Sequence, residues 1–387
     1  MNLREFGTEL EVNARAGNAV LVKSGSGFGK SQKVRQVFRR MRAADAEKGI
    51  KWGFGTVFLA TQTPSDLIGY QFKGETVVPA EYSSDGKEHK FTVTDPSMPL
   101  WMLSEDGIPA CCFDKFFLVI DEYGQGDPDT KRASAEVLLN GGTPPWYLPP
   151  GSVRVACSNQ GGSSDSRYGV TKDFDFCYAR RTELAIHGDA TIWIEDFADK
   201  AYTHQSQTWQ VMPVVKAWAR SNPGILFEKE PEKQGAWCNP RTLTSFDRYL
   251  QVKGGNDGSQ IDPSDALTME VGAGTIGQAA TSSLLDHFRF AIELPQYDNV
   301  VADPEGTPVP ARADLILLMV YKLAGSARPE DGAPLIKYIK RFPSDSAVSF
   351  IKSVMNRDYK AFTNSPPVMG WIAKNAALVN AMQAITG

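Results

Sequence analysis

The residues Ser24-Gly25-Ser26-Gly27-Phe28-Gly29-Lys30-Ser31 follow the apolar run Ala19-Val20-Leu21-Val22 and precede a helix-like segment from Gln32 to Met41. Glycines in such a loop allow successive backbone N–H groups to turn toward an anion, and the next helix adds its positive N-terminal end. Lysine then reaches the β- and γ-phosphates of a nucleotide, and the serine hydroxyl binds Mg²⁺. This stretch therefore predicts a phosphate-binding loop between a strand and a helix.

One position departs from the usual motif: Ser24 stands where glycine is standard, whereas Gly27, Gly29, Lys30 and Ser31 keep the spacing. The alternative is a flexible Gly/Ser loop that binds nothing. The strand before the loop and the helix after it favour phosphate binding. The residues expected to contact ATP are Gly25, Ser26, Gly27, Phe28, Gly29, Lys30, Ser31 and Gln32.

The composition is that of a globular protein with more than one domain. Its 387 residues are 42% hydrophobic, enough to bury a large core in two or three domains. A net charge of -4 argues against a surface built throughout to hold nucleic acid, although a local basic groove stays open. Five cysteines without a CxxC spacing, and no apolar signal segment after Met1, predict reduced thiols in a cytoplasmic protein. The apolar runs Phe116–Ile120 and Leu315–Tyr321 are too short to span a bilayer.

The pattern before residue 188 alternates β-rich runs with helical segments, which is typical of a parallel sheet flanked by helices. The expected strands are Ala19–Val22, Thr56–Ala60, Phe116–Ile120, Val153–Cys157 and Glu183–Ile186. Between the second and third strands lies a stretch from about residue 61 to 110 that is unusually long for a loop. We therefore expect an α/β fold with a functional insertion there.

The pattern after residue 189 is helical. The expected helices are Trp209–Arg220, Arg241–Val252, Ala280–Leu294, Ala311–Ala324 and Pro334–Phe342. Loops rich in Gly, Asn, Asp or Pro, from Lys253 to Pro263 and from Asp303 to Pro310, divide this half of the chain.

Two acids end the third expected strand, Phe117-Leu118-Val119-Ile120-Asp121-Glu122. Ligands of open α/β folds bind at the carboxyl edge of the sheet, so this pair and the phosphate loop should face one crevice. Asp121 can hold Mg²⁺ beside Ser31, and Glu122 can polarise the water that attacks the γ-phosphate. The alternative is an acidic pair that ends a strand on the surface.

The fourth expected strand ends in Ser158-Asn159-Gln160. An Asn amide between two strand ends can orient the lytic water and sense the γ-phosphate, because it offers both a donor and an acceptor. Alone, Asn159 would be an ordinary turn residue. Its order in the chain favours the functional interpretation.

Three arginines are candidates for contact with the nucleotide. Arg180 and Arg181 lie at an element boundary, where an arginine delivered to a neighbouring subunit's γ-phosphate would stabilise the transition state. The alternative is a solvated pair, and which of the two acts stays open, with Arg180 slightly favoured. Arg241 follows Asn239-Pro240 at a helix start and can swing toward a phosphate, the alternative being a surface arginine.

The residues SGSGFGKS, FFLVIDE, ACSNQ, CYARR and NPRT, in that order, resemble the MoxR-like branch of the AAA+ ATPases, in the compact form common in bacteriophage and bacterial genomes. The segment Ser65-Asp66-Leu67-Ile68-Gly69 lies where that branch carries Asp-Leu-x-Gly before an insertion, and Trp146-Tyr147-Leu148-Pro149-Pro150-Gly151 looks like the hairpin before the first sensor strand. The resemblance continues through Ala273–Gly277 and the loop from Asp303 to Pro310, and so covers nearly the whole chain.

The resemblance implies a role for each candidate. Lys30 and Ser31 would belong to the nucleotide loop, Asp121 would bind the metal, and Glu122 would be the catalytic acid. It further implies Asn159 as first sensor, Arg180 or Arg181 as the trans-acting finger, and Arg241 as second sensor. The doubled arginine departs from the family, which usually has an arginine followed by an aromatic residue, and this leaves the finger assignment open.

The resemblance also implies an architecture and a partner. We expect an AAA+ nucleotide domain over residues 1–188 with an insertion at about 61–110, a helical lid over 189–300 and a helical C-terminal extension over 301–387. Members of the branch generally form hexameric rings that hydrolyse ATP and remodel a partner protein, often one with a von Willebrand factor A domain. The insertion would contact that partner through Tyr70, Phe72 and Trp101, unless these aromatics pack on the core.

Two other functions remain open at this point. A nucleic-acid-translocating motor would need a basic strip on its pore loops, and Lys73, Lys87, Lys90, Lys131 and Arg132 offer only a scattered one. A nucleotide-gated scaffold would assemble on ATP with little hydrolysis, against which Glu122 argues. The four histidines are widely scattered, so no metal other than Mg²⁺ is expected.

Overall fold

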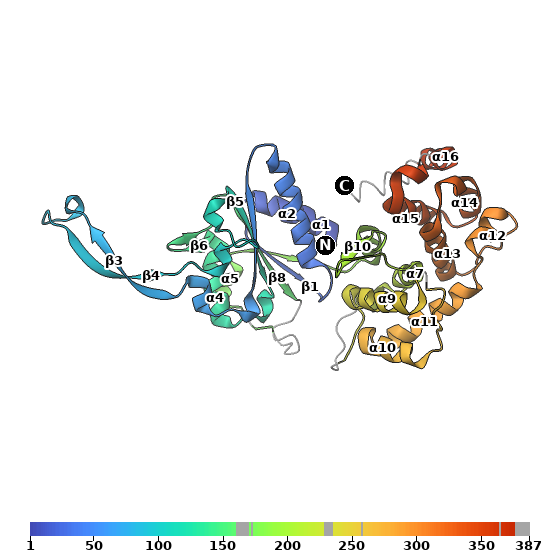
Figure 1. The fold of residues 1–387 in the computed structure, drawn as a ribbon, viewed down its shortest axis with the longest axis horizontal. Coiled ribbons are helices and arrows are strands. Elements are labelled where there is room, and N and C mark those ends of the chain that lie inside the picture. The colour runs from blue at the N-terminus through green and yellow to red at the C-terminus, as the bar shows by residue number, and fades with distance from the viewer. Residues whose placement is uncertain (160–169, 172, 228–234, 257, 364, 376–387) are drawn as a thin grey trace. The chain divides into compact units, whose positions relative to one another are not determined.

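The computed structural model describes residues 1–159, 170–171, 173–227, 235–256, 258–363 and 365–375. The chain divides into two compact units, Met1–His187 and Gly188–Gly387 (Figure 1). The first contains the parallel sheet, and the second is almost entirely helical.

The first unit is built on five parallel strands in the order β2-β5-β8-β1-β9. Their bounds are β1 Val20–Ser24, β2 Trp52–Phe58, β5 Lys115–Asp121, β8 Val153–Asn159 and β9 Thr182–Ala185. The flanking helices are α1 Leu3–Arg15, α2 Lys30–Ala46, α3 Pro64–Ile68, α4 Pro128–Asn140 and α5 Asp175–Tyr178. The predicted parallel sheet is confirmed.

Helices cover both faces of the sheet because side chains alternate along each strand. In β5, Phe117 and Val119 pack with α1 and α2, whereas Phe116, Leu118 and Ile120 pack with α3 and α4. All five side chains are buried. A strand buried on both faces reads as a continuous apolar run, which is why its position was evident in the sequence.

The predicted bounds of β2 were wrong: Thr56–Ala60 was expected, but the strand begins at Trp52. Its glycines concealed it, since glycine is rare in strand interiors. A Cβ atom on Gly53 would lie 2.6 Å from the rings of Phe113 and Phe116, so the glycine makes room for these rings.

The insertion forms a long antiparallel ribbon of β3 Gln71–Val78 and β4 His89–Pro96. The ribbon extends away from the sheet of its own unit (Figure 1). Two sets of hydrogen bonds fix its base. Ser97 N–H donates to Tyr70 O, and Tyr70 N–H donates to Ser97 Oγ. Trp146 Nε1, in the hairpin β6 Gly142–Thr143 and β7 Trp146–Tyr147, donates to Pro96 O.

The aromatics of the insertion divide into two groups. Tyr70 and Phe72 are 56% and 61% exposed, as expected. Trp101 is only 1% exposed and its Nε1 donates to Leu67 O at 2.7 Å, so the expectation that it faces a partner was wrong. Trp101 instead belongs to the core beside α3.

The second unit has one hydrophobic core that runs from Ala190 to Trp371. Its longer helices are α7 Pro213–Ser221, α9 Pro240–Gly254, α10 Ala266–Ile276, α11 Gln278–Glu293, α12 Tyr297–Ala302, α13 Ala313–Ser326, α14 Gly332–Ile339, α15 Ser344–Thr363 and α16 Pro366–Lys374. Shorter elements are α6 Ala190–Trp193, a π-helical turn Ile194–Ala198, β10 Tyr202–His204, β11 Gln207–Trp209 and α8 Pro223–Leu226. Among the residues that the structure describes, no helix has the length and apolar character needed to cross a membrane.

The predicted helix Trp209–Arg220 was wrong at its start, because Trp209 ends β11 and the helix begins at Pro213. Proline is favoured in the first helical turn, where its missing N–H is not needed. Of the longer helices of this unit, α10, α12, α15 and α16 were not predicted.

Asp247 in α9 is fully buried, and burial raises its pKa to about 7 although Met212 N and Gln251 Nε2 donate to it and Lys216 and Arg248 lie nearby. The unfolded chain, with the ordinary pKa of 3.8, releases this proton first, so stability is lost as pH rises from about 4 to about 7.

We expect Asp247 to lower the free energy of unfolding by on the order of 2–4 kcal/mol as the pH rises from 4 to 7. Denaturant unfolding of wild type and Asp247→Asn at pH 5 and pH 8 measures it, because other groups cancel in the difference. The variant should lose less stability than wild type at the higher pH. Equal losses would show that Asp247 is ionised throughout this range.

Candidate functional site

The loop between β1 and α2 has the backbone of an anion cradle. Gly27 and Gly29 adopt φ of 77° and 85°, values that side chains rarely allow, and Gly29 caps α2. A Cβ atom on Gly25 would lie 2.7 Å from the Phe28 ring, so a larger residue there would have to displace that ring. The loop therefore presents backbone N–H groups next to the N-terminus of a helix of 17 residues.

Lys30 lies at the centre of this loop and is 8% exposed. Its Nζ donates to Ser24 O at 3.2 Å, to Ser24 Oγ at 3.0 Å, to Gly25 O at 3.1 Å and to Asn159 Oδ1 at 3.0 Å. Ser24, which the motif gave no role, thus holds the lysine through its hydroxyl. Its φ is not among the positive values, so the missing glycine costs the loop nothing in conformation.

Ser31 and Asp121 meet across the end of the sheet, where Ser31 Oγ donates to Asp121 Oδ2 at 2.7 Å. Hydroxyl and carboxylate oxygens are hard donors of the kind that Mg²⁺ prefers, with its remaining positions filled by water and phosphate oxygens. The donor set that the structure brings together therefore fits the predicted metal.

Glu122 follows Asp121 in a left-handed conformation, with φ of 53° and ψ of 31°. Its backbone N–H donates to Asp121 Oδ1 at 2.9 Å, which orients the metal-ligand candidate, and its side chain is exposed. This conformation is strained for a residue other than glycine, so the surrounding structure must hold the Glu122 backbone in it.

Asn159 is the last residue of β8 and lies opposite Ser24 in the parallel pairing of β8 with β1. This register brings its Oδ1 to Lys30 Nζ. The structure thus gathers Lys30, Ser31, Asp121 and Asn159 at one edge of the sheet, with Glu122 directly after Asp121.

The two adjacent arginines have different surroundings. Arg181 has a side chain with 0% exposure; its Nη1 donates to Tyr123 Oη at 2.7 Å and its Nη2 pairs with Asp173 and, at 3.0 Å, with Glu183. Arg180 has a side chain that is 27% exposed and pairs with Glu136 of α4. Of the two, Arg180 has the guanidinium that is accessible without breaking a buried cluster.

The pKa values of the ionisable groups around Arg181 are shifted by burial and by their contacts with one another. Burial alone would raise the pKa of Asp173, but hydrogen bonds from Arg181 and Lys131 outweigh it and hold that pKa low. Burial lowers the pKa of Lys131 despite its contact with Asp173 at 3.0 Å, and burial raises the pKa of Tyr123. Asp173 is therefore a carboxylate between two cations at neutral pH.

Arg241 lies in the second unit, in the first turn of α9, and its side chain is exposed. Asn239 caps this helix by accepting from Arg241 N and Thr242 N at 3.0 Å, and Pro240 precedes the arginine. The local geometry is that of a helix start with an available cation, as predicted from the sequence.

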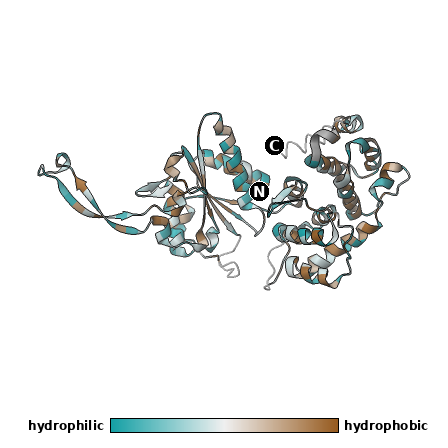
Figure 2. Ribbon diagram, in the orientation of Figure 1, coloured by the Kyte–Doolittle hydropathy of each residue, from teal (hydrophilic) through white to brown (hydrophobic). Residues whose placement is uncertain are grey.

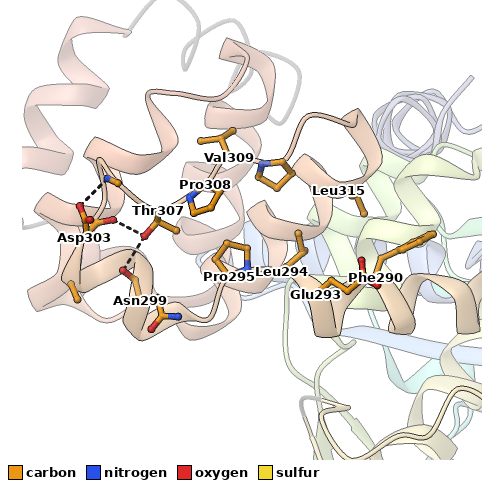
Figure 3. A pocket seen from close by; sticks show the side chains of 13 residues that line it. Phe290, Glu293, Leu294, Pro295, Asn299, Asp303, Thr307, Pro308, Val309 and Leu315 are labelled. Atoms are coloured by element: carbon orange, nitrogen blue, oxygen red, sulfur yellow. Dashed lines mark hydrogen bonds between the residues drawn. The ribbon is translucent and has the colours of Figure 1, made fainter.

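The second unit also has a pocket of about 700 Å³ between the end of α11, α12 and the loop before α13 (Figure 3). Apolar side chains such as Phe290 and Val309 line it. Its polar groups bind one another, since Asp303 Oδ1 accepts from Gly306 N at 2.8 Å and Thr307 Oγ1 donates to Asn299 O at 3.1 Å. It contains none of the candidate residues.

Comparison with known proteins finds solved structures that resemble this chain in fold at low sequence identity. No family model and no curated protein matches the chain. Two crystal structures of NtrX from Brucella abortus are similar: one has 16% identity over 78% of this chain and 61% of that one, with a TM-score of 0.40. The other, in complex with ADP, has 16% identity over 92% and 67%, with a TM-score of 0.36. Orc1 from Aeropyrum pernix, in complex with DNA, has 15% identity over 87% and 75%, with a TM-score of 0.36.

Scores at this level assign no family, so the class of the protein follows from its own geometry. A parallel sheet lies between two layers of helices, and a glycine-rich loop joins β1 to α2 beside the carboxyl ends of β5 and β8. The chain is therefore an α/β protein with a P-loop core followed by a helical C-terminal unit.

Proposed function

We propose that this protein is an Mg²⁺-dependent ATPase of the AAA+ class, of the MoxR-like branch that its motifs resemble. The observation that carries the proposal is the convergence of Lys30, Ser31, Asp121 and Asn159 within hydrogen-bond distance at the carboxyl edge of the sheet. Four residues from three separate segments meet where a nucleotide's phosphates would bind.

The roles follow from the chemistry of each side chain. Lys30 would exchange its contacts with Ser24 and Asn159 for the β- and γ-phosphates. Mg²⁺, held by Ser31 and Asp121, would supply charge neutralisation at the phosphates. Glu122 would accept a hydrogen bond from the attacking water and orient it, and Asn159, freed from Lys30, would bind the same water or the γ-phosphate.

We propose that the site is completed by a neighbouring subunit in a ring, which the resemblance suggests is hexameric. Arg180 is the better candidate for the trans-acting finger, because Arg181 is enclosed by Tyr123, Asp173 and Glu183. Arg241 would act from the second unit as a sensor of the phosphates. Within that unit, residues 189–300 would form the lid and 301–387 an extension that shares its core.

We propose that the ribbon binds a client protein. Its cross-strand pairs place Phe72, Val93 and Phe91 on one face. The other face carries Lys73, Glu75 and Lys90, with Val77 as its exposed apolar residue. The three apolar side chains of the first face are 61%, 37% and 52% exposed, and hydrophobic residues are visible along the ribbon (Figure 2). Residues 71–96 carry three lysines against five carboxylates, a balance that disfavours nucleic acid as the occupant.

A photoreactive residue tests this surface. Placed at Phe91, it should crosslink to one client protein in extract of the native cell, whereas the same residue at Thr92, on the opposite face, should not. The purified client should then stimulate ATP turnover by the wild type, and replacing residues 73–94 with a short glycine turn should remove this stimulation while basal turnover is retained. Equal crosslinking from both positions, or adducts with nucleic acid, would contradict the proposal.

The proposed activity itself is tested by phosphate release from ATP in the presence of Mg²⁺, with Lys30→Ala as the inactive comparison. Turnover by the wild type that disappears in the variant and on chelation of the metal supports an ATPase. Absence of turnover at every protein concentration, with or without client, would contradict it.

A further inference from the structure

The turn that follows Glu122 is fastened to the segment that leads to the two arginines. Tyr123 Oη accepts from Arg181 Nη1 at 2.7 Å. Thr171 donates twice to the same turn, from its N–H to Gly124 O at 2.9 Å and from its Oγ1 to Gly126 O at 2.6 Å. Three hydrogen bonds therefore join the turn after Glu122 to the segment around residues 171 and 181.

The same turn also contacts the strand that carries Asn159. A Cβ atom on Gly124 would lie 2.3 Å from Ser158 Oγ and 3.3 Å from Val170, so the turn is closely packed between them. A shift of either β5 or β8 at its carboxyl end is thus passed to the turn, because tightly packed elements move as units.

The contact between Tyr123 and Arg181 belongs to a buried cluster of charged groups that hold one another in place. The guanidinium lies 4.8 Å from the centre of the Tyr123 ring, Lys131 Nζ lies 5.4 Å from it, and Asp173 binds both cations. All are buried, so no member can leave without stranding a charge in a site that water does not reach.

Arg180 is the immediate neighbour of this anchored residue and lies in a different environment. Its guanidinium pairs with Glu136 and lies 5.1 Å from the centre of the Phe176 ring. Adjacent residues thus have different roles in the packing. Arg181 is buried and bonded to the turn after Glu122, whereas Arg180 is partly exposed and accessible to a neighbouring subunit.

We propose that Arg181 is a positioning residue that couples the nucleotide site of its own subunit, through Tyr123, to Arg180, the arginine offered to the next subunit. The inference rests on the proposed function, and it explains why the chain has two adjacent arginines. Arg180 acts on the neighbour's phosphate, and Arg181 transmits to it the position of the turn that follows Glu122.

Tyr123→Phe is the variant that tests this coupling: it keeps the ring and removes the hydroxyl, which accepts from Arg181 Nη1 and also bonds the Cys177 thiol. Tyr178→Phe is the matched control: its ring lies 5.4 Å from the same guanidinium, but among the described residues no hydrogen bond joins the two side chains. Thermal unfolding of both variants establishes that the fold is retained.

The test uses rings assembled from two inactive subunits, one with Glu122→Gln and one with Arg180→Ala. Working sites in such rings take Arg180 from the first subunit and Glu122 from the second. Adding Tyr123→Phe to the subunit that donates Arg180 should lower the restored turnover about tenfold, the effect of one lost hydrogen bond to a charged group. Tyr178→Phe in the same subunit should leave it unchanged.

The outcomes separate the inference from the function on which it rests. If Tyr123→Phe lowers turnover only when placed in the subunit that supplies Glu122, the residue acts within its own site and the coupling is refuted. If the parent pair of subunits restores no turnover although the wild type is active, the shared site fails and the coupling fails with it.

Discussion

Replacing Glu122 with glutamine is expected to lower kcat for ATP hydrolysis about 10²–10⁴-fold, the range in which a positioned acid or base acts, while ATP still binds. Glutamine keeps the size of the side chain but is not a proton acceptor. It is also no easier to place at φ of 53° than glutamate, so the strained backbone should be unaffected.

The measurement is steady-state phosphate release together with the Kd for ATP by equilibrium binding. A fall in kcat with an unchanged Kd assigns Glu122 to the chemical step. Equal rates in wild type and variant would leave the carboxylate without a role and would favour the nucleotide-gated scaffold.

Replacing Arg180 with alanine is expected to lower kcat about 10³–10⁵-fold, the contribution of an arginine that stabilises the charge of a phosphoryl-transfer transition state. The side chain is 27% exposed and pairs with Glu136 at the surface, so its loss should change thermal stability little. Turnover, ATP binding and Tm, measured on one preparation, report the three effects.

Arg181→Ala is the comparison that distinguishes the adjacent arginines. It removes a cation with 0% exposure from Asp173 and Tyr123, which should cost on the order of 3–5 kcal/mol of stability and lower Tm. If instead Arg181→Ala is stable and inactive while Arg180→Ala is active, Arg181 is the finger.

The contacts between strand ends could be expected from the sequence because they follow from topology. Parallel strands end at one edge, so an acid pair after an apolar run, a polar residue after the next run and a glycine-rich loop had to be close together. The contacts of Ser31 with Asp121, and of Lys30 with Asn159, are the outcome of that rule.

Other features were decided by tertiary contacts that a sequence does not display. Trp101 packs in the apolar core and Leu67 O accepts the hydrogen bond of its Nε1, and no periodicity in the sequence marks either contact. Ser24 accepts a hydrogen bond from Lys30 through its hydroxyl, although it stands at a position where the motif has glycine. The ribbon was expected only as an insertion, since a two-stranded element with exposed faces lacks the strict alternation of a half-buried strand.

The central claim, a nucleotide site shared between subunits, is tested most directly by mixing Glu122→Gln subunits with Arg180→Ala subunits and measuring phosphate release from ATP. Each variant alone should be nearly inactive. Random mixing in equal amounts should restore about one quarter of wild-type turnover, because that share of head-to-tail interfaces combines an intact Glu122 with an intact Arg180. A mixture no more active than its separate components would contradict the shared site.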